Sequence, residues 1–403
     1  MRRYKTYING EWFEGTSEIV LRSVDPSNNK ELGEIVQNSK EDVEYAIESA
    51  SRSFYKTREW RDLDVQQRSD KLLKIADMIE SEIDEIAKTE SMDNGKPLRE
   101  AQADVDDAVH CFRYYAGLIR TPSGQTYNVN SNFGNMHSYT VKEPVGVCAL
   151  ITPWNFPFLM SVWKIAPALA AGNSIIFKPS SETVLSALKL FEILDKCDLP
   201  KGTANLVIGS GSTVGNLLAE SKKVGMITFT GSTSVGQGIM RAAAGNVKKI
   251  GLELGGKSPN IVFADTDIDK TVEWVMMGIF LNQGEVCCAG SRLIIEKSIK
   301  DKFLKKLVDK TDKLTLGAPL DNPDMGPLIS KKHMQDVLGY IEKGKAEGAK
   351  LLCGGYKCTD DDLVNGNFIK PAIFDDCTSD MSIVREEIFG PVLTVLTFET
   401  EEE

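Results

Sequence analysis

Between residues 145 and 256 the chain alternates short apolar runs with segments of helical periodicity, and this alternation constrains its fold more than any other feature. Strands that alternate with helices in this way form βαβ units, whose strands lie parallel in one sheet. A second series of apolar runs begins at Pro259. We therefore predict a mixed α/β protein with two sheet-based units and place their boundary near residues 254–256. The runs of the first series read VGVCALIT, NSIIFKP, ANLVIG, VGMITFTG and KKIGLELGG, and those of the second read NIVFADT, SRLIIEK and FIKPAIF.

The N-terminal part of the chain predicts a hairpin followed by helices. Asn9-Gly10 in TYINGEW is typical of a type I′ turn between two short strands. Ser39 and Asp42 form a capping pair for a helix. A second helix is expected over residues 65–92 and a third through residue 115. The apolar stripe of the first helix consists of Val43, Ala46, Ile47, Ala50 and Phe54.

The polar stretch of residues 121–141 combines turn residues with β-formers. It predicts either a projecting hairpin or a mobile loop.

Length and charge narrow the class of protein. A chain of 403 residues exceeds the size that one core usually supports, so two or more domains are expected. The net charge of −11 and the pI near 5.1 argue against nucleic acid or an anionic membrane as a partner. The opening MRRYKTYINGEW has no apolar core and is no signal peptide. The longest apolar tract, residues 145–172, contains three prolines and Lys164, which indicates a buried segment and not a membrane span.

The eight cysteines have no disulfide-scaffold spacing, which indicates a reduced, cytoplasmic protein. The three histidines lie far apart, so we expect no metal site and no Ser-His-Asp triad. A cysteine hydrolase stays open at this point, because its histidine would meet the cysteine only in the fold, although no residue pattern favours it.

Cys287 in NQGEVCCAGSR is the candidate nucleophile, because Gly284 and Gly290 bracket it and would let the backbone approach a ligand closely. A buried cysteine that only packs is the alternative. Glu253 in KKIGLELGG is the candidate base. Alternation along that strand turns Gly251 and Glu253 away from its apolar face, although a solvated strand-end glutamate would look the same. A thiol and a carboxylate are what the oxidation of an aldehyde through a thioester requires.

Two glycine- and proline-framed segments supply further candidates. Asn155 in ITPWNFP offers an amide that could stabilise an oxyanion, or it is a plain turn asparagine. Gly231 to Gly236, GSTSVG, follows a strand-like run and would open a helix, whose N-terminus favours phosphates. On its own this glycine pattern is a weak signal for a dinucleotide.

Together these four segments resemble the aldehyde dehydrogenase superfamily, and the resemblance runs from YINGEW to EEIFGPV. It implies a Rossmann-like cofactor domain of residues 1–120 and 142–254, a catalytic domain of residues 255–403 and an oligomerisation hairpin of residues 121–141. In the family's signature the last cysteine of FLNQGEVC, Cys287, is the nucleophile, and Glu285 here replaces the commoner glutamine. Glu253 would be the general base for deacylation, and Asn155 with the Cys287 amide would form the oxyanion hole.

The resemblance also implies NAD or NADP as cofactor. Lys178 corresponds to the lysine that reaches the adenosine ribose. Many NAD-selective members carry a glutamate three residues later, where this chain has Ser181 followed by Glu182, so both cofactors stay open. Glu387 and Phe389 match the nicotinamide-ribose carboxylate and its neighbouring aromatic. The implied cofactor-binding residues are Ile151, Thr152, Pro153, Trp154, Lys178, Ser181, Gly211, Gly215, Phe229, Thr230, Gly231, Ser232, Val235, Gly236, Leu254, Glu387 and Phe389.

The run DVDDAVHCFRYYAG resembles the betaine-aldehyde and aminoaldehyde dehydrogenases, in which acidic residues here attract a cationic substrate. Asp104 and Asp107, spaced i,i+3, would share one helical face, with a solvated acidic face as the alternative. Phe156 and Trp163 would supply aromatic walls for an ammonium group, although Phe156 stands where those enzymes often have tyrosine.

We therefore expect oxidation of a small-molecule aldehyde, with a cationic aldehyde as the expected substrate, by an NAD(P)-dependent, non-acylating dehydrogenase that assembles as a homodimer or homotetramer. CoA-acylating and phosphate-reducing relatives lack the base, so Glu253 counts against them. Because TFETEEE stops where a new helix should begin, the resemblance implies a chain incomplete at its C-terminus. A catalytically silent member that retains nucleotide binding or a packing role is the alternative.

Overall fold

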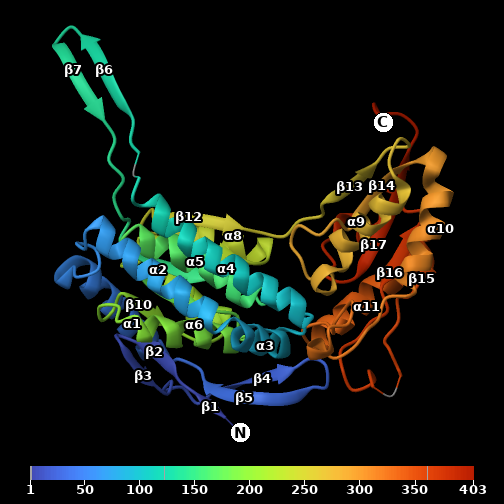
Figure 1. Cartoon of the computed structure of the whole chain (residues 1–403), viewed down its shortest axis with the longest axis horizontal. Coiled ribbons are helices and arrows are strands. Elements are labelled where there is room, and N and C mark those ends of the chain that lie inside the picture. Colours follow the sequence, from blue (N-terminus) through green and yellow to red (C-terminus); the bar gives the residue numbers. More distant parts are fainter. Residues whose placement is uncertain (1, 122, 361) are drawn as a thin grey trace.

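The structure is a computed structural model that describes residues 2–121, 123–360 and 362–403. It contains two α/β units, each built on its own sheet, and a two-stranded hairpin that projects from the first unit (Figure 1). A separate three-stranded sheet lies near the N-terminus and consists of β1 (Arg3–Tyr4), β5 (Lys30–Val36) and β4 (Val20–Asp25), in that order.

The first unit holds a seven-stranded sheet in the order β12-β11-β8-β9-β10-β2-β3. Its five predicted strands are all present and mutually parallel, and the predicted β2–β3 hairpin pairs antiparallel at one edge. β8 is the middle strand of the five parallel strands. From β8 the chain passes to β9 and β10 on one side and then returns to β11 and β12 on the other side. Ligands of open α/β sheets bind at such a switch point, outside the carboxyl ends of the strands. The bounds are β12 (Lys249–Glu253), β11 (Met226–Thr230), β8 (Val147–Ile151), β9 (Ser174–Lys178), β10 (Ala204–Leu206), β2 (Thr6–Ile8) and β3 (Glu11–Phe13).

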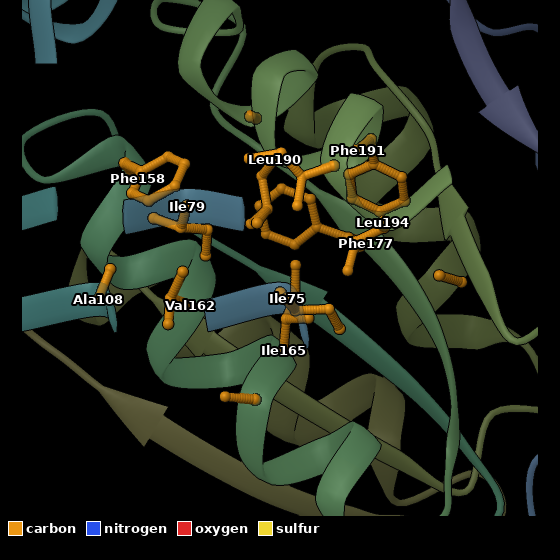
Figure 2. Close-up of a cluster of buried hydrophobic side chains, with 14 of the residues drawn as sticks. Ile75, Ile79, Ala108, Phe158, Val162, Ile165, Phe177, Leu190, Phe191 and Leu194 are labelled. Carbon is orange, nitrogen blue, oxygen red and sulfur yellow. The ribbon is translucent and has the colours of Figure 1, made fainter. Parts of the chain in front are cut away.

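Helices cover both faces of this sheet, and each face has its own apolar core. On one face α5 and α6 lie against the strands, with α2, α3 and α4 outside them. Figure 2 shows side chains of α2, α4, α5, α6 and β9 meeting around Phe177 in this core. The opposite face packs against α1, α7 and α8. The bounds are α1 (Lys40–Arg52), α2 (Val65–Ser81), α3 (Ile83–Asn94), α4 (Leu98–Leu118), α5 (Pro157–Ala170), α6 (Leu185–Lys196), α7 (Asn216–Glu220) and α8 (Thr233–Ala243).

The second unit begins at β13 and has a five-stranded sheet in the order β13-β14-β17-β16-β15. The three predicted runs become β13, β14 and β16, while β15 and β17 were not predicted. Only β15 runs antiparallel. The bounds are β13 (Pro259–Val262), β14 (Arg292–Glu296), β17 (Val392–Phe398), β16 (Ala372–Asp375), β15 (Lys350–Cys353), α9 (Ile268–Phe280), α10 (Lys300–Thr311), α11 (Lys331–Ala346) and α12 (Ser382–Arg385).

Local predictions near the N-terminus are confirmed. Asn9 and Gly10 have φ of 56° and 80°, as a type I′ turn requires. Ser39 and Asp42 form a reciprocal capping box at the start of α1, and the predicted apolar stripe of that helix is buried. Residues 126–139 form the hairpin β6 (Thr126–Ser131) and β7 (Gly134–Tyr139), so the projecting hairpin, and not the mobile loop, is the alternative that the structure shows.

The single helix predicted over residues 65–92 is wrong. The chain leaves the helix at Glu82, where φ is −112° and ψ is 15°, and α3 begins at the next residue. Ile79 before the break and Ile86 after it are both fully buried in the same core. The redirection lets both helices pack against α4, which no local signal in the sequence announces.

Candidate active site

Cys287 lies in the loop between α9 and β14, and an unusual backbone shapes this loop. Asn282, Gln283 and Gly284 follow one another with φ of 45°, 58° and 75°, so the chain turns sharply before the cysteine. A Cβ at residue 284 would collide with the backbone of Gly390. Burial raises the pKa of the half-buried Cys287 thiol above its usual range.

The two glycines that bracket Cys287 lie against other segments of the protein. Gly284 approaches Gly390, and a Cβ at Gly290 would collide with the Asn260 amide, which donates a hydrogen bond of 3.1 Å to the Gly290 carbonyl. Both glycines therefore permit close contact between segments of the protein itself. They position the loop that carries Cys287, whereas the sequence predicted that they would let the backbone approach a ligand.

Glu253 ends β12 at the edge of the first sheet, and its carboxylate is exposed. As predicted, Ile250, Leu252 and Leu254 pack on the core side of the strand, whereas Gly251 and Glu253 face the other way into a cavity of about 630 Å³. Cys287 lines the same cavity. The remaining lining residues come from α5, β8, β11 and the segments beside them, among them Met160, Trp163, Lys164 and Thr228.

A lysine lies beside the candidate base. Lys164 Nζ donates a hydrogen bond of 2.9 Å to Thr228 Oγ1 in the cavity wall. Burial lowers the pKa of Lys164 to about 8, and the negative charge of Glu253 opposes that shift only in part. From the sequence this lysine was only a charge that argues against a membrane span. The signal that could have placed it in the cavity wall was its i,i+4 spacing from Met160 on one helix face.

Asn155 lies in the loop between β8 and α5 and is almost fully buried. The side-chain Nδ2 of Asn155 donates a hydrogen bond of 2.8 Å to the backbone carbonyl of Glu285. The backbone carbonyl of Asn155 accepts a hydrogen bond of 2.8 Å from Asn282 Nδ2. The loop of Asn155 and the loop of Cys287 are thus joined directly. One amide hydrogen of Asn155 is left for a second acceptor, which is what an oxyanion donor needs.

Most predicted cofactor residues gather at the carboxyl ends of β8, β9, β11 and β12. Phe229 and Thr230 end β11, Gly231 follows, and Ser232 is the N-cap of α8 without a side-chain capping bond. The backbone N–H groups of this helix terminus are therefore free for an anion. Gly236 packs against Leu254, which holds the helix close to β12. Ile151 and Thr152 lie at the end of the neighbouring β8, next to Pro153.

Lys178 ends β9 and is buried, and burial lowers its pKa to about 8. Its Nζ donates to the Pro179 carbonyl at 2.9 Å. Gly215 ends a π-helical turn that begins at Gly211, and its α-carbon faces the Lys178 side chain. Ser181 is half-buried just beyond this strand, while Glu182 and Val235 are exposed.

Glu387 and Phe389 reach the same region from the connection between α12 and β17. The backbone N–H of Gly256 donates a hydrogen bond of 3.2 Å to Glu387 Oε1, and a Cβ at Gly255 would collide with that carboxylate. Phe389 has a φ of 58°, and His333 Nε2 hydrogen-bonds its carbonyl at 2.7 Å. Trp154 packs edge-on against Phe389 with ring centroids 5.2 Å apart.

A nicotinamide dinucleotide fits these residues. An uncapped helix N-terminus suits its phosphates, and the lysine at the end of β9 and the carboxylate of Glu387 suit ribose hydroxyls.

The two acidic residues of α4 that were predicted to face the substrate, Asp104 and Asp107, do not share one role. Asp104 is buried, and its Oδ2 lies 2.5 Å from Lys96 Nζ, so it does not face a substrate as predicted. Asp107 is exposed and lines a surface pocket of about 560 Å³ with Tyr114 and Trp163. Positions i and i+3 differ by about 60° around a helix. Here that angle separates a core position from a solvent position.

The two aromatic residues predicted as walls for an ammonium group, Trp163 and Phe156, have different surroundings. Trp163 is 51% exposed and lines both the surface pocket and the cavity of Cys287, so it connects the two. Phe156 is half-buried, and the Lys96 ammonium lies over its ring at 4.1 Å from the centroid. That face of Phe156 is therefore occupied by a cation of the protein itself.

Comparison with known proteins agrees with this arrangement. The aldehyde dehydrogenase family matches residues 12–403. The chain is 47% identical over 398 residues to the betaine aldehyde dehydrogenase of Bacillus subtilis (strain 168), which covers 98% of this chain and 81% of that protein. It is 44% identical over 401 residues to the peroxisomal aminoaldehyde dehydrogenase 1 of Pisum sativum, with 98% and 79% covered.

The betaine aldehyde dehydrogenase of Staphylococcus aureus, solved in complex with NAD+, has a similar structure. The TM-score is 0.96 at 42% identity, and the match covers 99% of this chain and 79% of that chain. The chain therefore belongs to the aldehyde dehydrogenase family. Its reaction is the NAD(P)-dependent oxidation of an aldehyde.

Across residues 2–121, 123–360 and 362–403, no helix is both long and apolar enough to cross a membrane. Within these same ranges no three His, Cys, Asp or Glu side chains gather as metal ligands would.

Proposed function

We propose that Cys287 is the nucleophile, Glu253 the general base and Asn155 an oxyanion donor in this aldehyde oxidation. The observation that carries the proposal is that Cys287 and Glu253, from different units of the fold, line one cavity. The hydrogen bond that joins the Asn155 side chain to the Glu285 carbonyl adds the third group.

The chemistry follows from these positions. The Cys287 thiolate adds to the carbonyl carbon, and the Asn155 amide with the Cys287 N–H would stabilise the resulting alkoxide. A bound nicotinamide would accept the hydride, which leaves a thioester on Cys287. Glu253 then takes a proton from water, the hydroxide attacks the thioester, and the acid leaves as the thiolate is restored.

An aldehyde panel tests this assignment. Turnover would be followed by the absorbance of the reduced cofactor, with NAD and with NADP. We expect formation of the free carboxylic acid without added CoA or phosphate, because a general base is present. Dependence on CoA or phosphate would contradict the role of Glu253. Cofactor binding without turnover of any aldehyde would favour the catalytically silent alternative.

We propose a cationic aldehyde as the preferred substrate. The surface pocket of Asp107 combines a carboxylate with the aromatic rings of Tyr114 and Trp163, which suits an ammonium or trimethylammonium group. Trp163 also lines the cavity of Cys287, so a cation held in the outer pocket would direct the aldehyde inward. The likeness to proteins named betaine aldehyde and aminoaldehyde dehydrogenases supports this class.

We also propose that the β6–β7 hairpin is an oligomerisation element of a homodimer or homotetramer, separate from a cofactor domain (residues 1–120 and 142–254) and a catalytic domain (residues 255–403). The hairpin projects from the body (Figure 1), and large apolar side chains on it are exposed, as expected for a surface that a second copy covers. Sedimentation before and after removal of residues 124–140 tests the assembly. The exposed apolar side chains of the hairpin are Tyr127, Val129, Phe133, Met136 and Tyr139.

A cytoplasmic location is proposed from the unpaired cysteines.

A further inference from the structure

The segment from Glu90 to Lys96, which is the C-terminal end of α3 and the start of the turn toward α4, contacts the loop of Asn155 on both sides of that residue. Asn94 Nδ2 donates a hydrogen bond of 2.9 Å to the Trp154 carbonyl, just before Asn155. Glu90 Oε2 accepts one of 2.9 Å from the Phe158 N–H, after it. The Lys96 ammonium lies over the ring of Phe156. Nothing in the predicted site included this segment.

Lys96 is the centre of these contacts. It is fully buried, with Nζ at 2.5 Å from Asp104 Oδ2 and 3.5 Å from Glu90 Oε1. Burial alone would lower the pKa of Lys96, but the attraction of Asp104 and Glu90 outweighs that effect and raises it. A buried ammonium is tolerated only when its partners stay in place. The charge of Lys96 therefore holds Glu90 where that carboxylate binds the Phe158 N–H.

The same region also contacts the loop of the nucleophile. Glu100 Oε2, on the first turn of α4, accepts a hydrogen bond of 2.9 Å from the Asn282 N–H. Asn282 in turn donates from its side chain to the Asn155 carbonyl at 2.8 Å. The start of α4 thus fixes both sides of the proposed oxyanion hole, although it touches neither Cys287 nor the cavity.

We propose that Lys96 is a positioning residue for the oxyanion hole. Its ammonium, held by Asp104 and Glu90 and packed on Phe156, fixes the loop that carries Asn155 and so sets the direction of the Asn155 amide. The inference rests on the role of Asn155 in the proposed function. It also assigns a purpose to Asp104, which the sequence had assigned to the substrate.

The test removes the closest charge pair together. Lys96→Met/Asp104→Asn changes little volume and removes both charges of the closest pair, so that Glu90 alone loses its ammonium partner. We expect kcat to fall about ten- to hundredfold, which is no more than the ~10²–10³ that one oxyanion donor contributes. The Kd of the cofactor should stay within about twofold, the size of ordinary non-coupling effects. In an Asn155→Ala background the same pair should lower kcat by less than about twofold, because both changes remove one function.

Hydrogen exchange gives a measurement that does not need activity. The amide of Phe158 should exchange faster in the pair variant and in the milder Asp104→Asn, which serves if the pair variant does not fold. Lys189→Met is the matched control. Its ammonium also lies between two carboxylates, at 2.5 Å from Glu85 of α3 and 3.5 Å from Glu192 of its own helix α6, and the Glu85 pair joins α6 to α3. This control should change neither kcat nor exchange at Phe158.

The outcomes separate the two proposals. An unchanged kcat in Asn155→Ala would overturn the role of Asn155 itself. If Asn155→Ala lowers kcat while the Lys96 variants keep the parental kcat and the parental exchange, only the role of Lys96 is overturned. A fall in kcat that adds fully to that of Asn155→Ala would also overturn it, since Lys96 would then act elsewhere.

Discussion

The side-chain amide of Asn155 donates a hydrogen bond of 2.8 Å to the backbone carbonyl of Glu285, which lies just before the Val286–Cys287 pair. This bond joins the loop after β8 of the first sheet to the loop before β14 of the second. It brings the proposed oxyanion donor to the proposed nucleophile without any contact that depends on a ligand. The site is therefore organised by the protein alone, as electrostatic preorganisation requires.

Replacement of the nucleophile should separate catalysis from binding. We expect Cys287→Ala to abolish turnover, because the proposed mechanism forms the thioester on the Cys287 thiol, while the cofactor Kd changes by less than about twofold. Cys288→Ala is the control and should keep most of the activity. Thioester labelling found on Cys288 in the parent protein would contradict the assignment.

Loss of the base should stop the cycle after the first hydride transfer. Because Glu253 is assigned only to deacylation, Glu253→Gln should give a burst of about one reduced cofactor per site and a steady rate lower by about 10²-fold or more. Rapid-mixing absorbance measures both phases. A steady rate equal to that of the parent would remove Glu253 from the mechanism.

The choice between NAD and NADP tests the role of Ser181, which follows shortly after the end of β9. Ser181 carries no charge to repel a 2′-phosphate, so we expect NADP to be used with a kcat/KM within about tenfold of that for NAD, a difference of about 1.4 kcal/mol. Ser181→Glu should shift the preference toward NAD. Glu182→Gln, one position later and exposed, should change it little. If the parent protein shows no measurable NADP use, the argument from Ser181 fails.

Substrate charge tests the outer pocket. Betaine aldehyde should be preferred over 3,3-dimethylbutanal, its neutral isostere, by roughly three- to thirtyfold in kcat/KM, from about 0.5–2 kcal/mol of cation–π attraction. Trp163→Leu should remove most of this preference. Asp107→Asn should lower it by about fivefold at most, because an exposed charge contributes about 0–1 kcal/mol, and less at high salt. Equal kcat/KM for both aldehydes would contradict the outer pocket as a cation site and leave Asp107 as a solvated surface residue.

Glu285 gives a prediction on stability. Burial raises the pKa of this carboxyl well above its usual value, and one of its oxygens has no hydrogen-bond partner among the described residues. In the unfolded chain this carboxyl loses its proton at about pH 4.3, and the folded protein holds the proton to a higher pH. Stability is therefore lost as pH rises above that value.

Glu285→Gln removes the titrating carboxyl and with it the loss of stability as pH rises. We expect the variant to be more stable than the parent at neutral pH by about 1–3 kcal/mol, with the difference vanishing near pH 4. Urea unfolding across this pH range measures it, and the exposed Glu18→Gln serves as the control. A variant less stable than the parent at pH 7 would show that the Glu285 carboxylate is needed by the fold.

The sequence by itself determined the elements whose causes are local. Apolar runs with turn residues at their ends predicted the five parallel strands of the first sheet, and Asn9-Gly10 and Ser39–Asp42 predicted their turn and cap. These features depend on the conformations that neighbouring residues allow. The four segments that contain Asn155, Gly231, Glu253 and Cys287 likewise indicated the family that the comparisons then showed.

Only the tertiary structure decided which groups meet. A helical spacing placed Asp104 and Asp107 on nearly one face, yet packing buried the first against Lys96 and left the second in solvent. The break at Glu82 and the close approach of Gly284 to Gly390 have the same origin. Each depends on contacts between residues far apart in the chain, whose energies no local pattern of residues contains.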